Sequence, residues 1–95
     1  MRTPDWRMWL LHDRPRELAQ VVFLLHPEWQ DFASETEVGG LELAIPCGTD
    51  TIRLICDDEV TRVEYGLDKR TLEDREAMRY VESLLATQKS TQMRG

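Results

Sequence analysis

The sequence contains few of the residues on which several common kinds of protein depend. Of its 95 residues, two are cysteines, five are glycines and 7% are aromatic. The cysteines, Cys47 and Cys56, stand nine positions apart, a spacing that matches neither a zinc-ligand pair nor a redox motif. We therefore predict two free thiols in a reducing compartment, which favours a cytoplasmic protein.

Long apolar runs are also missing. No stretch approaches the roughly 20 apolar residues of a membrane-spanning helix. Residues 1–6 lack the apolar core and the small-residue cleavage site of a signal peptide. The sequence therefore predicts a protein without membrane association.

Motifs for catalysis and cofactor binding are missing too. Gly39 and Gly40 alone do not make a phosphate-binding loop, and no nucleophile is accompanied by a base and an orienting group in a recognisable pattern. His12 and His26 lack a carboxylate at a spacing that would indicate a metal site. The sequence predicts a protein that is not an enzyme and that binds no cofactor or metal.

Basic residues are outnumbered by acidic ones. The chain has 12 Lys and Arg against 18 Asp and Glu, for a net charge of −6. Nucleic acids and anionic lipid surfaces require a basic face, so neither is an expected partner. Such acidity suits a basic protein partner, or it serves only to keep the chain in solution.

The middle of the chain alternates apolar and polar residues as antiparallel strands do. Residues 41–45, 51–56 and 60–67 each place apolar residues on one face, and turns at 46–50 and 57–59 separate them. We predict an antiparallel meander. Its inward-facing residues are expected to be Leu41, Leu43, Ile45, Ile52, Leu54, Cys56, Val63, Tyr65 and Leu67.

The first third of the chain is interpreted as two further strands. Residues 6–11 and 18–25 are rich in aromatic and aliphatic side chains that suit strands. Residues 12–16 form a polar turn with Pro15 as its breaker. A long polar loop follows over residues 27–40.

A helix over residues 18–25 is the alternative. Asp13 is able to cap its start. Helical spacing relates the apolar residues Leu18, Val21, Val22 and Leu25.

The end of the chain predicts a helix over residues 71–87. Thr71 suits the N-cap, and Glu73 and Asp74 suit the first turn because negative charge stabilises a helix start. One apolar stripe consists of Ala77, Met78, Val81, Leu84 and Leu85.

We expect one domain over residues 1–88, followed by a flexible tail at 89–95. The helix at 71–87 is predicted to cover a strand face opposite the core. This face consists of Trp9, Leu11, Val22, Leu24 and Ile55. The alternative is that the helix or the bare face binds a second copy of the chain, as a homodimer.

Residues 21–29 follow the pattern Val-x-Phe-x-Leu-His-Pro-x-Trp. Together with the aromatic-led residues 6–9 and with Gly48 in the turn after the next strand, they resemble the YEATS family of acyl-lysine readers. The resemblance implies a mainly β protein: a small immunoglobulin-like antiparallel β-sandwich, here with one C-terminal α-helix. Prokaryotic relatives are similar to adaptor or sensor parts of bacterial defence and signalling systems.

The resemblance also implies a ligand pocket at the loop ends. Trp29 would supply a stacking face and His26 a polar guide, and Cys47 stands where the family has a second aromatic. The predicted ligand-binding residues are His26, Trp29, Phe32, Cys47, Gly48 and Thr49.

Two functions follow from these observations. The first is a non-enzymatic module that binds a protein or peptide. The second is a small acidic inhibitor or immunity protein, of phage or bacterial origin, that blocks a basic surface. Residues 57–59 are all acidic, which suits the second function.

Overall fold

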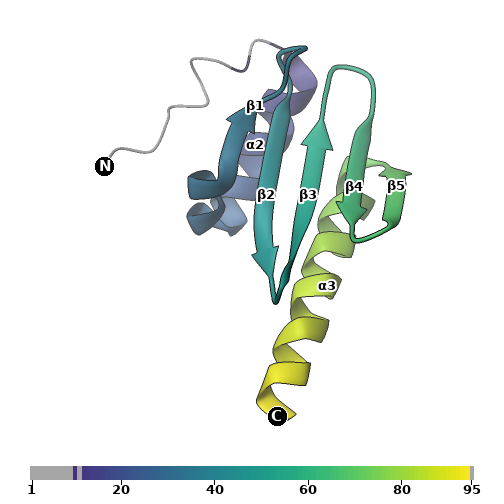
Figure 1. Ribbon diagram of the computed structural model, residues 1–95. Coiled ribbons are helices and arrows are strands. Elements are labelled where there is room, and N and C mark those ends of the chain that lie inside the picture. Colours follow the sequence, from purple (N-terminus) through teal and green to yellow (C-terminus); the bar gives the residue numbers. More distant parts are fainter. Residues whose placement is uncertain (1–9, 11, 95) are drawn as a thin grey trace.

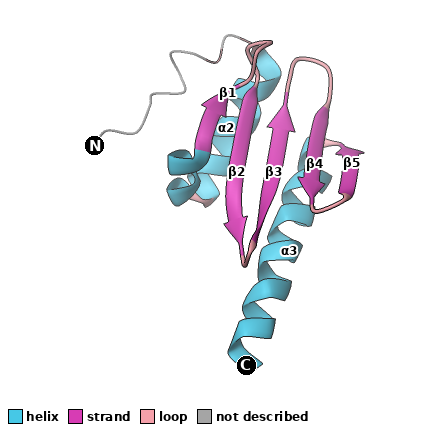
Figure 2. Cartoon of the chain, viewed as in Figure 1, coloured by secondary structure: helices cyan, strands magenta, loops and turns pink. Residues whose placement is uncertain are grey.

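A computed structural model of the chain describes residue 10 and residues 12–94, with side chains described as far as residue 87. It is a mixed α/β fold in which two helices lie on one face of a five-stranded antiparallel sheet (Figures 1 and 2). The strands are neighbours in chain order. The elements are α2 (Asp13–Leu25), η1 (Pro27–Phe32, a 3-10 helix), β1 (Ala33–Glu35), β2 (Leu41–Cys47), β3 (Asp50–Cys56), β4 (Thr61–Tyr65), β5 (Asp68–Leu72) and α3 (Asp74–Arg94).

The predicted meander is confirmed by β2, β3 and β4. Leu43 pairs with Leu54, and Leu54 pairs with Val63, so the apolar residues of the three strands share one face. That face forms the core beneath the helices. Its buried members are Leu41, Leu43, Ile45, Cys47, Ile52, Leu54, Cys56, Thr61 and Val63.

The prediction for the end of β4 is wrong. Leu67 does not face inward but is fully exposed in the turn after β4, where Gly66 has a φ of 62° that favours glycine. The chain then forms β5, a strand that the sequence did not indicate. Thr71 pairs with Arg62 in this strand, so it does not cap a helix, and α3 begins at Asp74.

The strand predicted over residues 18–25 is also wrong, because these residues belong to α2. The helical alternative is confirmed, with Leu18, Ala19, Val22 and Phe23 buried on one side. Pro15 is not a breaker, since it lies in the first turn, where a backbone N–H has no helical acceptor to lose. His12 is the N-cap, and Asp13 is the first helical residue.

The predicted strand at residues 6–11 lies outside the described residues except at Leu10, which is buried and belongs to no strand. The predicted loop at 27–40 contains η1 and β1. Pro27 opens η1, and Ala33 pairs with Leu43 to add the first strand to the sheet.

The apolar stripe of α3 is confirmed. Ala77, Met78 and Val81 are buried, and Leu84 and Leu85 pack against the core. The helix covers the inner face of the sheet, however, and not the face that carries Ile55 as predicted. It also continues to Arg94, through residues expected to form a tail.

The open face of the sheet is polar. Ile55 is half-buried there, and Arg53 lies between Glu42 (2.6 Å) and Glu64 (3.7 Å) on the neighbouring strands. Among the described residues there is one sheet, and helices pack on its inner face where a sandwich would place a second sheet. The immunoglobulin-like sandwich is therefore not confirmed.

Candidate functional site

The structure places His26 and Trp29 together, but not as an open pocket. Their rings stack with centroids 3.9 Å apart and planes 9° apart. Trp29 is only 4% exposed, so the prediction that it offers a stacking face to a ligand is wrong. The chain bends tightly between α2 and η1, and the indole turns into the core.

Both ring nitrogens of His26 already have partners. Nε2 lies 2.8 Å from a carboxylate oxygen of Glu82 on α3, and Nδ1 lies 3.5 Å from Glu28. With Trp29 against its ring, His26 joins the end of α2 to the middle of α3. Within the described residues it links the two helices, and its role in guiding a ligand stays a prediction.

The other four predicted site residues are divided between the core and the surface. Phe32 packs against the core, and Cys47 is buried at the end of β2, with its thiol 3.9 Å from both the Tyr65 hydroxyl and the Leu84 carbonyl. Gly48 and Thr49 are exposed in the turn between β2 and β3. Of the six residues, His26 and Trp29 are the pair in direct ring contact.

The two cysteines are free thiols, as predicted. Cys47 pairs with Asp50 at one end of β2 and β3, whereas Cys56 pairs with Leu41 at the other end. Burial raises the pKa of the Cys56 thiol, so it stays protonated and is a poor nucleophile. The raised pKa of Cys56 therefore makes this position unsuited to thiol catalysis.

A site that the sequence did not indicate lies between α2 and α3. The helices are joined at both ends. Arg14 at the start of α2 donates to Asp74 at the start of α3 (2.9 Å), and His26 after α2 meets Glu82 in the third turn of α3. Since start meets start, the two helices run in the same direction across the sheet (Figure 1).

Between these two ends the helices leave a groove of about 480 Å³. Leu18 and Met78 form its floor and are nearly buried, whereas Val21 and Leu25 are 50% and 58% exposed. Leu24, beside them on α2, is 81% exposed. We call Val21, Leu24 and Leu25 the apolar strip of α2. On a helix, these three residues lie outside the buried stripe of α2. The strip could therefore have been identified from the sequence once this segment was known to be helical.

The rim of the groove carries charges of both signs. Asp74 is bound by Arg14 and by the Thr61 hydroxyl, and Glu82 is bound by His26. Glu17 on α2 and Arg75 and Arg79 on α3 are exposed and take part in no ion pair among the described residues. The unpaired charge is therefore negative on the α2 wall and positive on the α3 wall.

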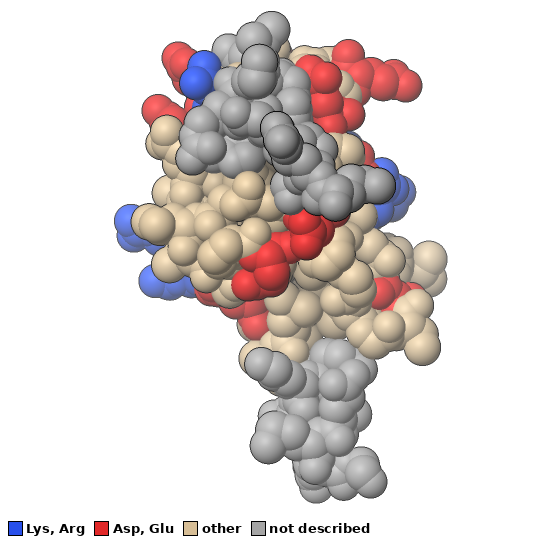
Figure 3. All heavy atoms as spheres, turned by 90° about the vertical axis from the view of Figure 1, so that its left-hand side faces the viewer, with Lys and Arg blue, Asp and Glu red and all other residues tan. Residues whose placement is uncertain are grey.

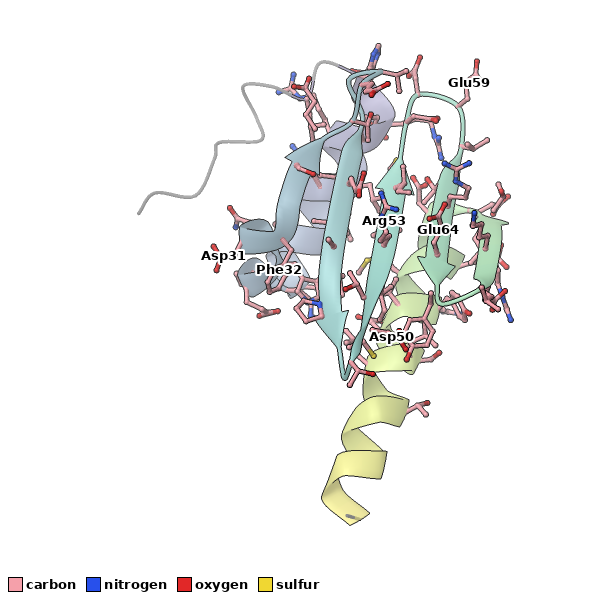
Figure 4. The ribbon with its side chains drawn as sticks, in the orientation of Figure 1. Asp31, Phe32, Asp50, Arg53, Glu59 and Glu64 are labelled. Atoms are coloured by element: carbon pink, nitrogen blue, oxygen red, sulfur yellow. The ribbon has the colours of Figure 1, made fainter. Side chains whose placement is uncertain are left out.

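A second depression, of about 620 Å³, lies over the open face of the sheet. Arg53 and Glu64 lie on neighbouring strands there (Figure 4). Hydrogen bonding to Glu42 raises the pKa of Arg53. Arg53 and Arg62 there are paired with Glu42 and Glu64, so the positive charges of these two arginines are already compensated.

Acidic side chains are unevenly spread over the surface. They run across the middle of the face that carries η1 and β1, whereas Lys and Arg lie at its edges (Figure 3). Within residues 12–94, no helix has the length and apolarity to cross a membrane, and no three His, Cys, Asp or Glu side chains lie close enough to hold a metal ion. Comparisons with protein-family models, curated proteins and solved structures give no match.

Proposed function

We propose that this protein is a non-enzymatic interaction module that docks a protein partner on its helical face, at the groove between α2 and α3. The observation that supports this function is the apolar strip of α2. Three large aliphatic side chains within five residues are exposed there, next to a groove with an apolar floor. Contiguous apolar surface of this kind is characteristic of interaction sites.

The size of the strip indicates the strength of the interaction. Covering three half-exposed or exposed aliphatic side chains contributes on the order of 3–5 kcal/mol. A micromolar complex requires about 8 kcal/mol, net of the cost of association. The strip would thus supply a large share of a weak or transient complex, with the charged rim setting orientation.

An adaptor or sensor role in bacterial defence or signalling remains part of this proposal. The kinship with the YEATS family stays a prediction, since no match tests it. Recognition of an acylated lysine between aromatic faces is not proposed, because the indole of Trp29 is buried against His26.

Affinity capture from cells that encode the protein tests the function. Leu24→Glu with Leu25→Glu places two charges in the strip, and Leu67→Glu makes the same change at a fully exposed leucine in the β4–β5 turn. The double variant is expected to lose the proteins that the wild type and Leu67→Glu retain. Equal capture by all three proteins would remove the helical face from consideration.

A second candidate function is inhibition of a basic protein surface. Asp57, Asp58 and Glu59 surround a cavity of about 280 Å³ next to Val38, which is 67% exposed. A partner that docks there would be steered by charge, and its association would weaken steeply with salt.

Asp58→Asn with Glu59→Gln tests this candidate without disturbing the turn, because Asp57 alone accepts the turn's backbone N–H groups. Loss of capture in this variant, and in high salt, would support inhibition. Capture that survives both but fails in the Leu24→Glu, Leu25→Glu protein would support the helical face.

A further inference from the structure

We propose that the groove between α2 and α3 binds a short amphipathic helix of another protein, with acidic side chains along the edge that lies over α3. This inference rests on the proposed function, because it names the chemistry of the partner that docks on the helical face. The backbone of the groove walls, their apolar lining and their free charges each support it.

The walls of the groove are helices, and this favours a helical occupant. Backbone N–H and C=O groups inside a helix already bond to one another, so the walls offer none to an incoming chain. An extended peptide would leave backbone groups unpaired against the apolar floor, which costs free energy. A helix satisfies its own backbone groups, and only its side chains have to fit the groove.

The apolar lining requires an amphipathic helix. Leu18 and Met78 form a nearly buried floor, and Val21 and Leu25 leave about half of their surface exposed above it. An occupant that covers these four side chains has to present apolar residues along one face only. The apolar stripe of a surface helix has this form, and a helix seated in a groove between two others is a common arrangement.

The free charges of the α3 wall select acidic side chains. Asp74 and Glu82, at the two ends of this wall, are already bound by side chains at the two ends of α2. Between them lie Arg75 and Arg79, one turn apart, which make no ion pair among the described residues. Carboxylates one turn apart on the partner helix would therefore meet both guanidinium groups.

This acidic partner differs from the basic one that the net charge of −6 suits. At physiological ionic strength, charges interact over about 8 Å, so the two arginines in contact with the partner outweigh acids elsewhere on the surface. Glu17 lies on the opposite wall, where it favours a neutral or basic side chain on the other edge of the helix. The local charge of the groove, and not the net charge, sets the preference.

Three synthetic peptides test the proposal by fluorescence anisotropy with the full chain at physiological ionic strength. Each is a helix of about 14 residues, longer than the roughly 10 Å from Arg75 to Glu82 along α3. All carry leucines along one face and a lactam bridge on the outer face that keeps them helical. They differ only in the residue repeated along one edge: glutamate, glutamine or lysine. The glutamate peptide is expected to bind about fivefold more tightly than the glutamine peptide, since each of two exposed ion pairs contributes about a factor of two.

Charge reversal on the protein tests the role of the two arginines. In the variant that combines Arg75→Glu with Arg79→Glu, the order is expected to reverse, so that the lysine peptide binds most tightly. The matched control combines Arg16→Glu with Lys69→Glu, which changes the net charge equally at exposed positions outside the groove. This control is expected to keep the wild-type order.

A substitution in the apolar wall tests the location. Leu25→Glu is expected to weaken all three peptides about tenfold or more, because it places a charge where the leucine face packs. Leu67→Glu, in the exposed turn between β4 and β5, is expected to leave all three unchanged. An unbridged glutamate peptide with a central proline is expected to bind at least about tenfold more weakly, because proline breaks the helix.

Four outcomes would overturn the acidic helix. The first is no binding of any peptide up to about 1 mM. The second is a glutamine or lysine peptide that binds the wild type as tightly as the glutamate peptide, which would exclude the acidic edge. The third is undiminished binding of the proline peptide, which would indicate an extended occupant. The fourth is a doubled mass in sedimentation that Leu25→Glu abolishes, which would assign the groove to a second copy.

The proposed function is judged separately, by capture. Partners that are lost in the Leu24→Glu, Leu25→Glu protein but retained when Arg75 and Arg79 are both reversed would keep the interaction module and overturn the acidic helix. Partners that both double variants lose, and that Leu67→Glu retains, would support the function and the acidic helix together.

Discussion

The meander (β2, β3 and β4) and the helix α2 both contain apolar segments that suit strands, yet only the segments of the meander form strands. In β2 every second residue (Glu42, Ala44 and Pro46) is partly or fully exposed, so the buried apolar residues share a single face. In α2 the run from Val21 to Leu25 is five apolar residues long and has no polar member. The comparison shows that alternation identifies a strand, whereas apolar content alone does not.

The two regions also differ in what their apolar residues do. Most of the apolar residues of β2 and β3 are buried on the inner face of the sheet. α2 buries Val22 and Phe23 but leaves Val21, Leu24 and Leu25 exposed. The high apolar content that made this segment resemble a buried strand also leaves these three residues exposed, and they mark the candidate interaction site.

The largest loss of stability is expected from a substitution in the core of the sheet. Leu54 is fully buried between β2 and β4, so Leu54→Ala should lower the free energy of unfolding by about 4 kcal/mol through lost burial and a cavity. Urea unfolding followed by circular dichroism measures this. A loss no larger than that of an exposed substitution such as Thr51→Ala would contradict the central place of Leu54.

The helical state of residues 18–25 is tested by proline. Gln20 is exposed in the middle of α2, where Gln20→Pro should cost about 3 kcal/mol because it removes a helical hydrogen bond and clashes with the preceding turn. Gln20→Ala, the control, should be neutral or slightly stabilising. A proline that is tolerated here would restore the strand interpretation.

Removal of the contact that Arg14 makes between α2 and the sheet should have a smaller effect on stability. Arg14 donates to Asp74, to Thr61 of β4 and to the Asp57 carbonyl. Arg14→Met keeps most of the side-chain length but removes these bonds, and should lower stability by about 1–2 kcal/mol. Thermal unfolding measures the change, and Arg16→Met serves as the exposed control. Equal melting temperatures for the two variants would refute the role of Arg14.

The smallest effect concerns pH. Backbone N–H groups of Val60 and Glu59 lower the pKa of Asp57. A lowered native pKa gives stability that is full above the unfolded value of about 3.9 and is lost as pH falls through the native pKa. Melting temperatures of the wild type and Asp57→Asn should therefore converge between about pH 4 and pH 2. A difference that stays constant over this range would be inconsistent with the shift.

Much of the sheet was predictable because its signals are local. Leu41, Leu43 and Ile45 alternate with Glu42 and Ala44, and Gly48 marks the following turn. β5 was not predictable from the same rule, since it is an edge strand of polar residues whose partner is β4. It is stabilised from outside its own sequence, for example by the Tyr80 hydroxyl, which donates to Asp68 (2.8 Å).

The candidate site depended on tertiary structure. His26 and Trp29 were correctly grouped, but their stack faces inward because η1 turns the indole under α2. The groove requires residues 60 positions apart, such as Arg14 and Asp74, to meet. The spacing of residues within each helix does not predict that the two helices lie side by side. The groove could therefore be recognised only after both helices were placed.

The positions of Cys47 and Cys56 give the molecule two built-in reporters. Each thiol is buried, and they mark opposite ends of the same strand pair. A thiol-specific reagent can reach either one only when the surrounding structure opens locally. Labelling rates followed separately at the two cysteines would therefore distinguish fluctuations near the β2–β3 turn from those where α2 begins, without the introduction of a new cysteine.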